Sequence, residues 1–158
     1  MRSLAFAALL LFAMCAPSTR YTADALPDEH LAFSFGGGFT GEYQEYLLLP
    51  NGQLFGRRRV VSEVPYREFE GVEAKVAKDL VATYARQGFG ALGYDDPGNI
   101  TYTVEHVAGA DTSRVRWGGT AVKPTEELRT YWRRLMAAIE GKERLPEASP
   151  SSPSSAAQ

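Results

Sequence analysis

The chain has 158 residues, 44% of them hydrophobic and 23% charged, and its 17 Lys and Arg against 19 Asp and Glu give a formal net charge of −2. This balance excludes the overall positive charge on which nucleic-acid binding depends. A single cysteine excludes an internal disulfide and a cysteine-based zinc cluster.

Residues 1–14 are predicted to be a lipoprotein-type signal peptide. Arg2 precedes an uncharged apolar stretch that ends at Cys15 and is about 11 residues long, well short of the roughly 20 that a membrane-spanning helix needs. The residues before Cys15 resemble a lipobox, from which Phe12 and Met14 depart. We expect export and lipidation of Cys15, which anchors the protein to the cell envelope, at the outer membrane or its periplasmic face. The alternative is an ordinary cleaved signal that removes Cys15.

Composition divides the remaining chain into three parts. Residues 15–28 are polar and irregular and are expected to be a tether. Residues 146–158 contain mainly Ser, Pro and Ala, which bury too little surface to fold, so a disordered tail is expected. Residues 29–145 are the right length for one domain.

The first half of this domain has the alternation of β-strands. Leu31, Phe33 and Phe35 alternate with smaller residues before a glycine run. Pro50-Asn51-Gly52 then predicts a hairpin turn that pairs Tyr43–Leu49 with Gln53–Val61.

The second half alternates helix and strand patterns. Apolar residues spaced by four around residues 72–84 predict an amphipathic helix that ends at Gly88. Ile100–Val104 and Arg114–Trp117 alternate and predict a second antiparallel hairpin. A last helix is expected from Pro124, with Pro124 in its first turn, to Gly141. The order β-β-β-α-β-β-α predicts an α+β fold, an antiparallel sheet with both helices packed on one face.

The sequence offers no catalytic or metal-binding set. His30 and His106 have no metal-ligand spacing; His30 is expected to be exposed and His106 to be a partly buried structural residue. An enzyme would need Glu45, His106 or Asp95 to act together, which their spacing does not support. We therefore expect a protein that is not an enzyme and has no cofactor, catalytic residue or metal.

Two features are candidate binding sites. The first is the loop Gly37, Gly38 and Phe39; no lysine and helix follow it, so a hairpin turn is favoured over a phosphate loop. Phe39 is expected to fold back on the sheet, and the alternative is an exposed anchor for a partner.

The second candidate is arginine-rich. Arg57 and Arg59 should share one strand face with Arg58 on the other, and Arg114 and Arg116 from the later hairpin would make the solvent face basic. Such a face either is simply solvated and prevents edge-to-edge pairing, or docks an acidic protein or an anionic headgroup.

The arrangement from Phe35 to Ile139 resembles the emfourin family of small metalloprotease inhibitors. The shared features are the Gly37-Gly38-Phe39 start, the helix ending before Phe89, the strand Ile100–Val104 and the proline-led final helix. The chain also looks like uncharacterised bacterial lipoprotein families of the same layout. The resemblance to emfourin implies an inhibitor of thermolysin-type proteases that acts without a cofactor.

The leading hypothesis is a non-enzymatic binding protein of the cell envelope, in its most concrete form an inhibitor of a secreted thermolysin-type metalloprotease. The expected partners are a membrane, through the N-terminal lipid, and another protein, but no nucleic acid. The alternative is a structural or accessory lipoprotein subunit of an envelope complex that docks through a basic sheet face.

Overall fold

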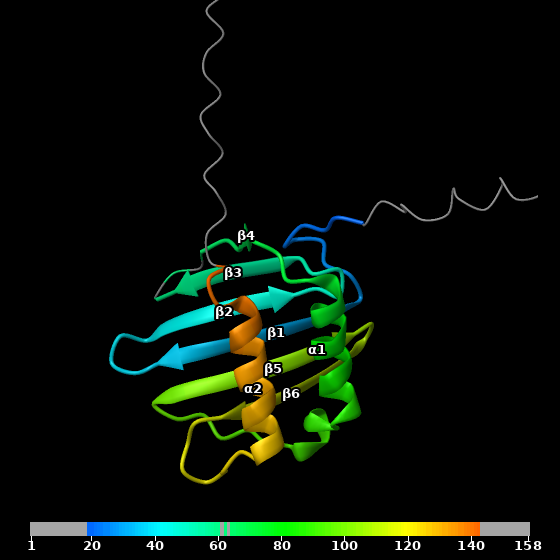
Figure 1. Ribbon diagram of the computed structural model, residues 1–158. Coiled ribbons are helices and arrows are strands. Elements are labelled where there is room, and N and C mark those ends of the chain that lie inside the picture. Colours follow the sequence, from blue (N-terminus) through cyan, green and yellow to red (C-terminus); the bar gives the residue numbers. More distant parts are fainter. Residues whose placement is uncertain (1–18, 61, 63, 143–158) are drawn as a thin grey trace, which may run out of the picture.

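A computed structural model describes residues 19–60, 62 and 64–142 and shows a six-stranded antiparallel sheet with two α-helices on one face (Figure 1). The elements are β1 (Glu29–Gly37), β2 (Glu42–Leu48), β3 (Leu54–Arg59), β4 (Arg67–Phe69), α1 (Ala74–Arg86), the 3-10 turn η1 (Phe89–Leu92), β5 (Ile100–Ala108), β6 (Asp111–Trp117) and α2 (Glu126–Ile139). The strand order is β4-β3-β2-β1-β5-β6. The predicted α+β class is confirmed, and the short edge strand β4 is an addition to the predicted order.

The main core lies between the sheet and the helices because alternate strand residues point to the helix side. Leu31 and Phe33 of β1 pair in register with residues of β2 and β5 whose side chains share this face. Buried residues of both helices cover them, among them Leu80 and Tyr84 from α1 and Leu128 from α2. We call this side the helix face and the opposite side the far face.

The predicted hairpin between β2 and β3 is confirmed. The amide of Leu49 donates to the carbonyl of Gln53 at 3.0 Å, and Leu48 pairs with Leu54. Gly52 has a positive φ of 92°, and a Cβ there would overlap the carbonyl oxygen of Val72, whose amide donates to Gly52 at 2.8 Å. The turn therefore docks on the segment that leads into α1.

The helix ends are only partly as expected. Gly88 and Gly141 follow α1 and α2 as predicted. The start of α2 differs, because Thr125 is its N-cap and accepts a hydrogen bond from the amide of Leu128 at 3.2 Å. Pro124 thus precedes the helix and does not lie in its first turn.

Residues 19–28 are not a free tether. Tyr21, Ala23 and Leu26 pack on the far face against a small cluster of Leu47, Leu49 and Phe55. The side chain of Gln53 binds the backbone of Tyr21 twice, accepting from its amide at 2.8 Å and donating to its carbonyl at 3.1 Å. The buried apolar area and these hydrogen bonds stabilise the segment on the sheet. Its polar composition does not predict this packing.

His30 is likewise not exposed. It is the second residue of β1 and keeps only 9% of its surface accessible, with Nδ1 3.1 Å from the carbonyl oxygen of Pro27. The predicted signal peptide, Cys15 and the tail 146–158 lie outside the described residues. Within the described ranges, no helix has the length and apolar character required to cross a membrane.

Candidate functional site

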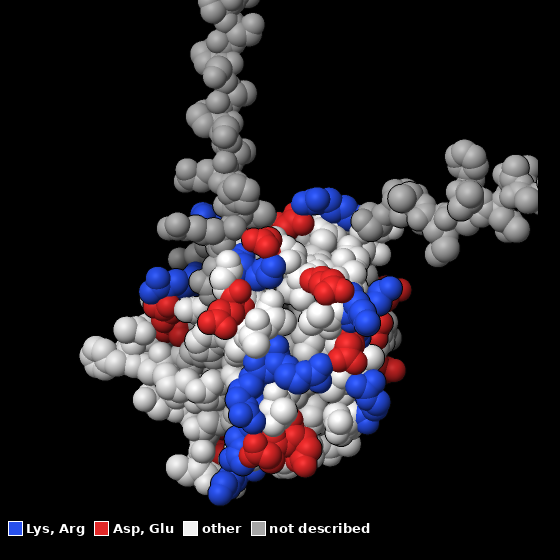
Figure 2. Space-filling view, in the orientation of Figure 1, with Lys and Arg blue, Asp and Glu red and all other residues white. Residues whose placement is uncertain are grey.

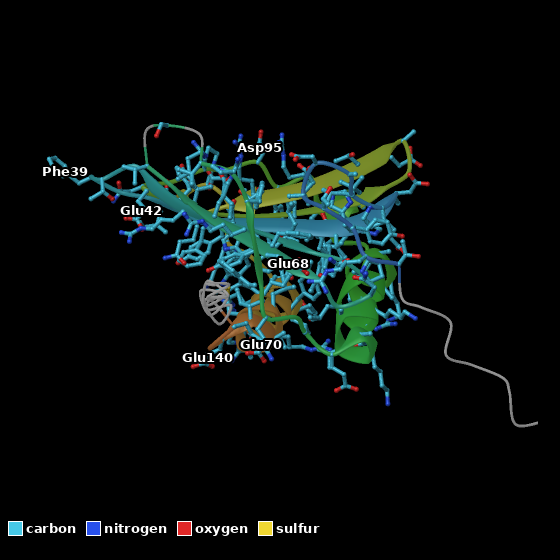
Figure 3. All side chains as sticks on the ribbon, turned by 90° about the horizontal axis from the view of Figure 1, so that it is seen from above. Phe39, Glu42, Glu68, Glu70, Asp95 and Glu140 are labelled. Carbon is cyan, nitrogen blue, oxygen red and sulfur yellow. The ribbon has the colours of Figure 1, made fainter. Side chains whose placement is uncertain are left out.

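The tip of the β1–β2 hairpin presents Phe39 to solvent. Gly37 pairs with Glu42 across the hairpin, and the amide of Gly38 donates to the carbonyl of Asn99 at 2.5 Å. Phe39 is fully exposed and stands at the outer end of the hairpin, pointing away from the body of the domain (Figure 3). The expectation that Phe39 folds back on the sheet is wrong, because Gly37 and Gly38 extend the hairpin past the sheet and Asn99 holds it there.

Further apolar residues continue from the tip along the helix face. Ile100 is 42% exposed, and a Cβ added to Gly38 would lie 3.3 Å from its Cδ1 atom. Tyr102 follows on the same side of β5, opposite Phe35 of β1, and Trp132 of α2 packs against both rings. We call Phe39, Ile100, Phe35, Tyr102 and Trp132 the apolar strip. The helix face is largely uncharged on the side of this hairpin (Figure 2).

The strip ends in an aromatic cleft between α2 and the sheet, with a volume of about 490 Å³ and walls that include Tyr102, Trp117, Pro124 and Trp132. The rings of Tyr102 and Trp117 stack with centroids 5.6 Å apart and an interplanar angle of 13°. Trp132 stands at 80° to Tyr102 and at 88° to Trp117. These two tryptophans are the only ones in the chain.

Charged residues of α2 form the rim of this cleft. Glu126 accepts from Arg129 at 2.5 Å and from Arg133 at 3.2 Å, so that one carboxylate serves two guanidinium groups. The hydrogen bond from Arg129 holds the pKa of Glu126 below its usual value. The carboxylate therefore stays ionised at neutral pH, and the rim carries charges of both signs.

The arginines of β3 lie where the strand period predicts, but they do not make a basic face. Arg57 and Arg59 are on the far face and both donate to the carboxylate of Glu45, with Arg59 at 2.9 Å. Their guanidinium groups also lie over the rings of Tyr66 and Tyr43. The expectation that these arginines make the face basic is wrong, because Glu45 lies opposite Arg57 in the register of β2 and β3. Docking of a partner on this face stays a prediction.

The two arginines of β6 are also near acidic groups. Arg116 lies 2.6 Å from Asp95, and Arg114 lies 3.9 Å from Glu105. The far face thus alternates positive and negative side chains, which is the usual state of a solvated sheet surface.

The residues that an enzyme would need are far apart. Glu45 and Asp95 are on the far-face side, whereas His106 is on the helix face. His106 is buried as expected, with Nε2 3.4 Å from Glu29 and its ring 5.6 Å from Tyr84.

Ser113 pairs with His106 in register, and its partly exposed side chain packs against Gly90 of η1. A Cβ on Gly90 of η1 would lie 2.8 Å from the Ser113 oxygen, so the backbone there packs directly on it. Across the part of the chain that the structure describes, no three His, Cys, Asp or Glu side chains gather as a metal site.

No protein-family model matches the chain, and no curated protein matches it significantly. The resemblance to emfourin inhibitors therefore stays a prediction.

The aromatic cleft is not predicted by the sequence. The apolar spacing places Trp132 on the stripe of α2, and the strand alternation places Tyr102 and Trp117 on two strands, but neither pattern shows that the three rings meet. The available signal was that both tryptophans stand next to arginines, at Arg116-Trp117 and Trp132-Arg133. Such pairs favour positions at the border between core and surface.

Proposed function

We propose that this protein is a non-enzymatic binding protein of the cell envelope that holds a protein partner through the apolar strip, with Phe39 as its anchor. The observation that carries this proposal is a fully exposed phenylalanine on a hairpin tip that is fixed by the Gly38–Asn99 hydrogen bond. Aromatic anchors surrounded by apolar surface are typical interface hot spots. A tip that is already ordered loses little conformational entropy on binding.

The most specific form of this proposal is inhibition of a secreted thermolysin-type metalloprotease. The resemblance at Gly37, Gly38 and Phe39 supports it, and so does the projecting shape of the hairpin, which a concave active-site cleft can admit. The predicted lipid on Cys15 would keep the inhibitor at the envelope, where secreted proteases pass.

The test is a titration of thermolysin-type proteases with the purified full-length protein. We expect activity to fall in proportion to the inhibitor added, to an end point near one inhibitor per protease. Phe39→Ala should weaken inhibition by about tenfold or more, the loss of a typical hot spot. Val76→Ala, at an exposed apolar residue on α1, is the control and should inhibit like the parent protein. Unchanged protease rates, or equal inhibition by Phe39→Ala, would contradict the proposal.

The arginine-bearing face gives less support to the alternative of an accessory subunit. Arg57 and Arg59 are only 21% and 36% exposed and both pair with the largely buried carboxylate of Glu45, so their guanidinium groups are poorly accessible to an acidic partner. Arg59→Gln should therefore leave partner binding unchanged, whereas the accessory-subunit alternative requires a clear loss.

A further inference from the structure

The walls of the aromatic cleft suit an apolar side chain. Its volume of about 490 Å³ is within the range of about 300–1,000 Å³ that is usual for ligand sites. Trp132 is held edge-on by Phe35, Tyr102 and Trp117, so its ring is oriented before anything binds. A planar or branched apolar group can enter such a cleft without ordering the walls first.

The rim of the cleft has more basic than acidic side chains, since in the part of the chain that the structure describes its lining holds two arginines and one glutamate. Arg129 and Arg133 share the single carboxylate of Glu126, and Lys123, also exposed, directly precedes Pro124 of the cleft wall. Basic side chains gather over α2 next to the uncharged region (Figure 2). This local excess of positive charge, in a chain of net charge −2, complements an anionic occupant.

Arg133 is the group best placed to receive such an occupant. Its side chain is 69% exposed, and it donates to Glu126 at 3.2 Å and to Thr130 at 2.9 Å, which are single contacts to each partner. A guanidinium group binds a carboxylate best through two parallel hydrogen bonds. An incoming carboxylate can offer Arg133 this geometry.

The spacing of the strip fits an extended peptide. Ile100 and Tyr102 are two residues apart on the same side of β5, a separation of about 7 Å. An extended peptide repeats its side chains on one face at the same interval. One side chain of a bound peptide can therefore enter the cleft at Tyr102. The peptide side chain two residues away then contacts Ile100 beside the hairpin tip.

We infer that the aromatic cleft is the subsite for an acidic peptide segment, in which an apolar side chain packs in the cleft against Trp132, Tyr102 and Pro124. An adjacent carboxylate pairs with Arg133 and Arg129. This inference rests on the proposed function, because the segment belongs to the protein partner that the strip holds. It adds the chemical character of the partner: an aromatic or branched residue next to Asp or Glu.

Intrinsic fluorescence tests the inference directly, because both tryptophans of the chain line the cleft. The probe is a capped pentapeptide, Gly-Asp-Phe-Asp-Gly, added to the full-length protein; its comparison peptides replace both Asp by Lys, or Phe by Ala. We expect a saturable change in tryptophan emission with the acidic peptide, weaker binding of both comparison peptides, and weaker binding at high salt.

Arg129→Gln with Arg133→Gln should reduce binding of the acidic peptide by about fivefold or more, since each exposed pair contributes up to about 1 kcal/mol. Arg134→Gln is the matched control on the same helix, because Arg134 pairs with Asp79 of α1. Equal binding of the lysine peptide, or no change in emission with the acidic peptide, would overturn the inference. A change produced by anionic phosphatidylglycerol vesicles and not by the peptide would overturn it too, in favour of a lipid contact.

The pentapeptide is too short to depend on the hairpin tip, so Phe39→Ala should bind it normally. If Phe39→Ala weakens protease inhibition but the parent protein does not bind the peptide, only this inference is contradicted. If the parent protein binds the peptide but Phe39→Ala inhibits the protease as well as the parent protein does, the role of Phe39 as anchor is contradicted instead.

Discussion

The position of Phe39 depends on the glycine two residues before it. Gly37 has φ 115°, and a Cβ there would overlap the carbonyl oxygen of Asn99, which accepts the Gly38 amide. Gly37→Ala should therefore lower the free energy of unfolding by about 2–4 kcal/mol or displace the tip. Gly41→Ala is the control: its φ is 62° with open space around it, so only the left-handed backbone costs about 1–2 kcal/mol. Equal losses in urea denaturation would contradict the fixed tip.

Glu45 is the residue that neutralises the arginines of β3. It is mostly buried and accepts from both Arg57 and Arg59. Glu45→Ala should lower the free energy of unfolding by about 1–3 kcal/mol, because it removes an acceptor shared by two partly buried cations. Glu42→Ala breaks the more exposed contact with Arg58 and should cost at most about 1 kcal/mol. Thermal or urea denaturation of both variants measures the difference, and a larger loss for Glu42→Ala would refute this ranking.

For single residues, the sequence predicts which face of a strand a side chain lies on better than it predicts the side chain's hydrogen-bond partner. Alternation along β3 is enough to place Arg57 and Arg59 on one face, because it needs no information about the neighbouring strands. Their pairing with Glu45 depends on the register that the turn at Pro50-Asn51-Gly52 imposes, and that register was recoverable by counting outward from the turn. Whether Phe39 is exposed depends on Asn99, which is distant in sequence and gives no local signal.

At the scale of elements, Asp79 connects the two helices. Its carboxylate accepts from Arg134 of α2 at 2.7 Å and lies 3.6 Å from Arg86, and the hydrogen bond from Arg134 lowers the pKa of Asp79. A carboxyl group whose pKa is lowered in the folded state stabilises it above the ordinary pKa, and this contribution is lost as pH falls through the lowered value.

Asp79→Asn should therefore be less stable than the parent protein near pH 7, and the difference should shrink as the pH falls below the ordinary pKa of Asp. Urea denaturation at neutral and at acidic pH measures it. Adding Arg134→Gln to Asp79→Asn should cost less than the sum of the single changes, since both remove the same contact. A stability difference that persists unchanged in acid would show that Asp79 acts through something other than its charge.

The elements that were predicted correctly carry local signals, and those that were missed do not. Turn residues at Pro50-Asn51-Gly52 and the four-residue spacing of α1 are readable in short windows. β4 has only three residues and exists because it pairs with β3 and because the backbone amide of Glu70, the next residue, donates to the backbone carbonyl of Lys142. Residues 19–28 look like a linker by composition, and only the hydrogen bonds of Gln53 and the cluster under Tyr21 hold them on the sheet.

For the whole molecule, the two faces of the sheet, and its two ends, differ in the surface that is accessible to a partner. The far face is occupied in part by residues 19–28 and otherwise carries alternating charges, whereas the helix face leaves Phe39 and Ile100 of the apolar strip exposed. The described chain begins at Thr19, whose carbonyl accepts from Asn51 at the end of β2 opposite to Phe39. β2 spans about 23 Å, so the first described residue and the hairpin tip lie at opposite ends of this strand.

Site-specific photo-crosslinking in cells that produce the protein tests the central claim that the apolar strip is the functional surface. A photoreactive residue is placed in turn at Phe39 and at Ile100, both on the strip, and at Arg114 on the far face. We expect the same protein adduct from positions 39 and 100 and none from position 114. An adduct from position 114 with none from the strip would contradict it.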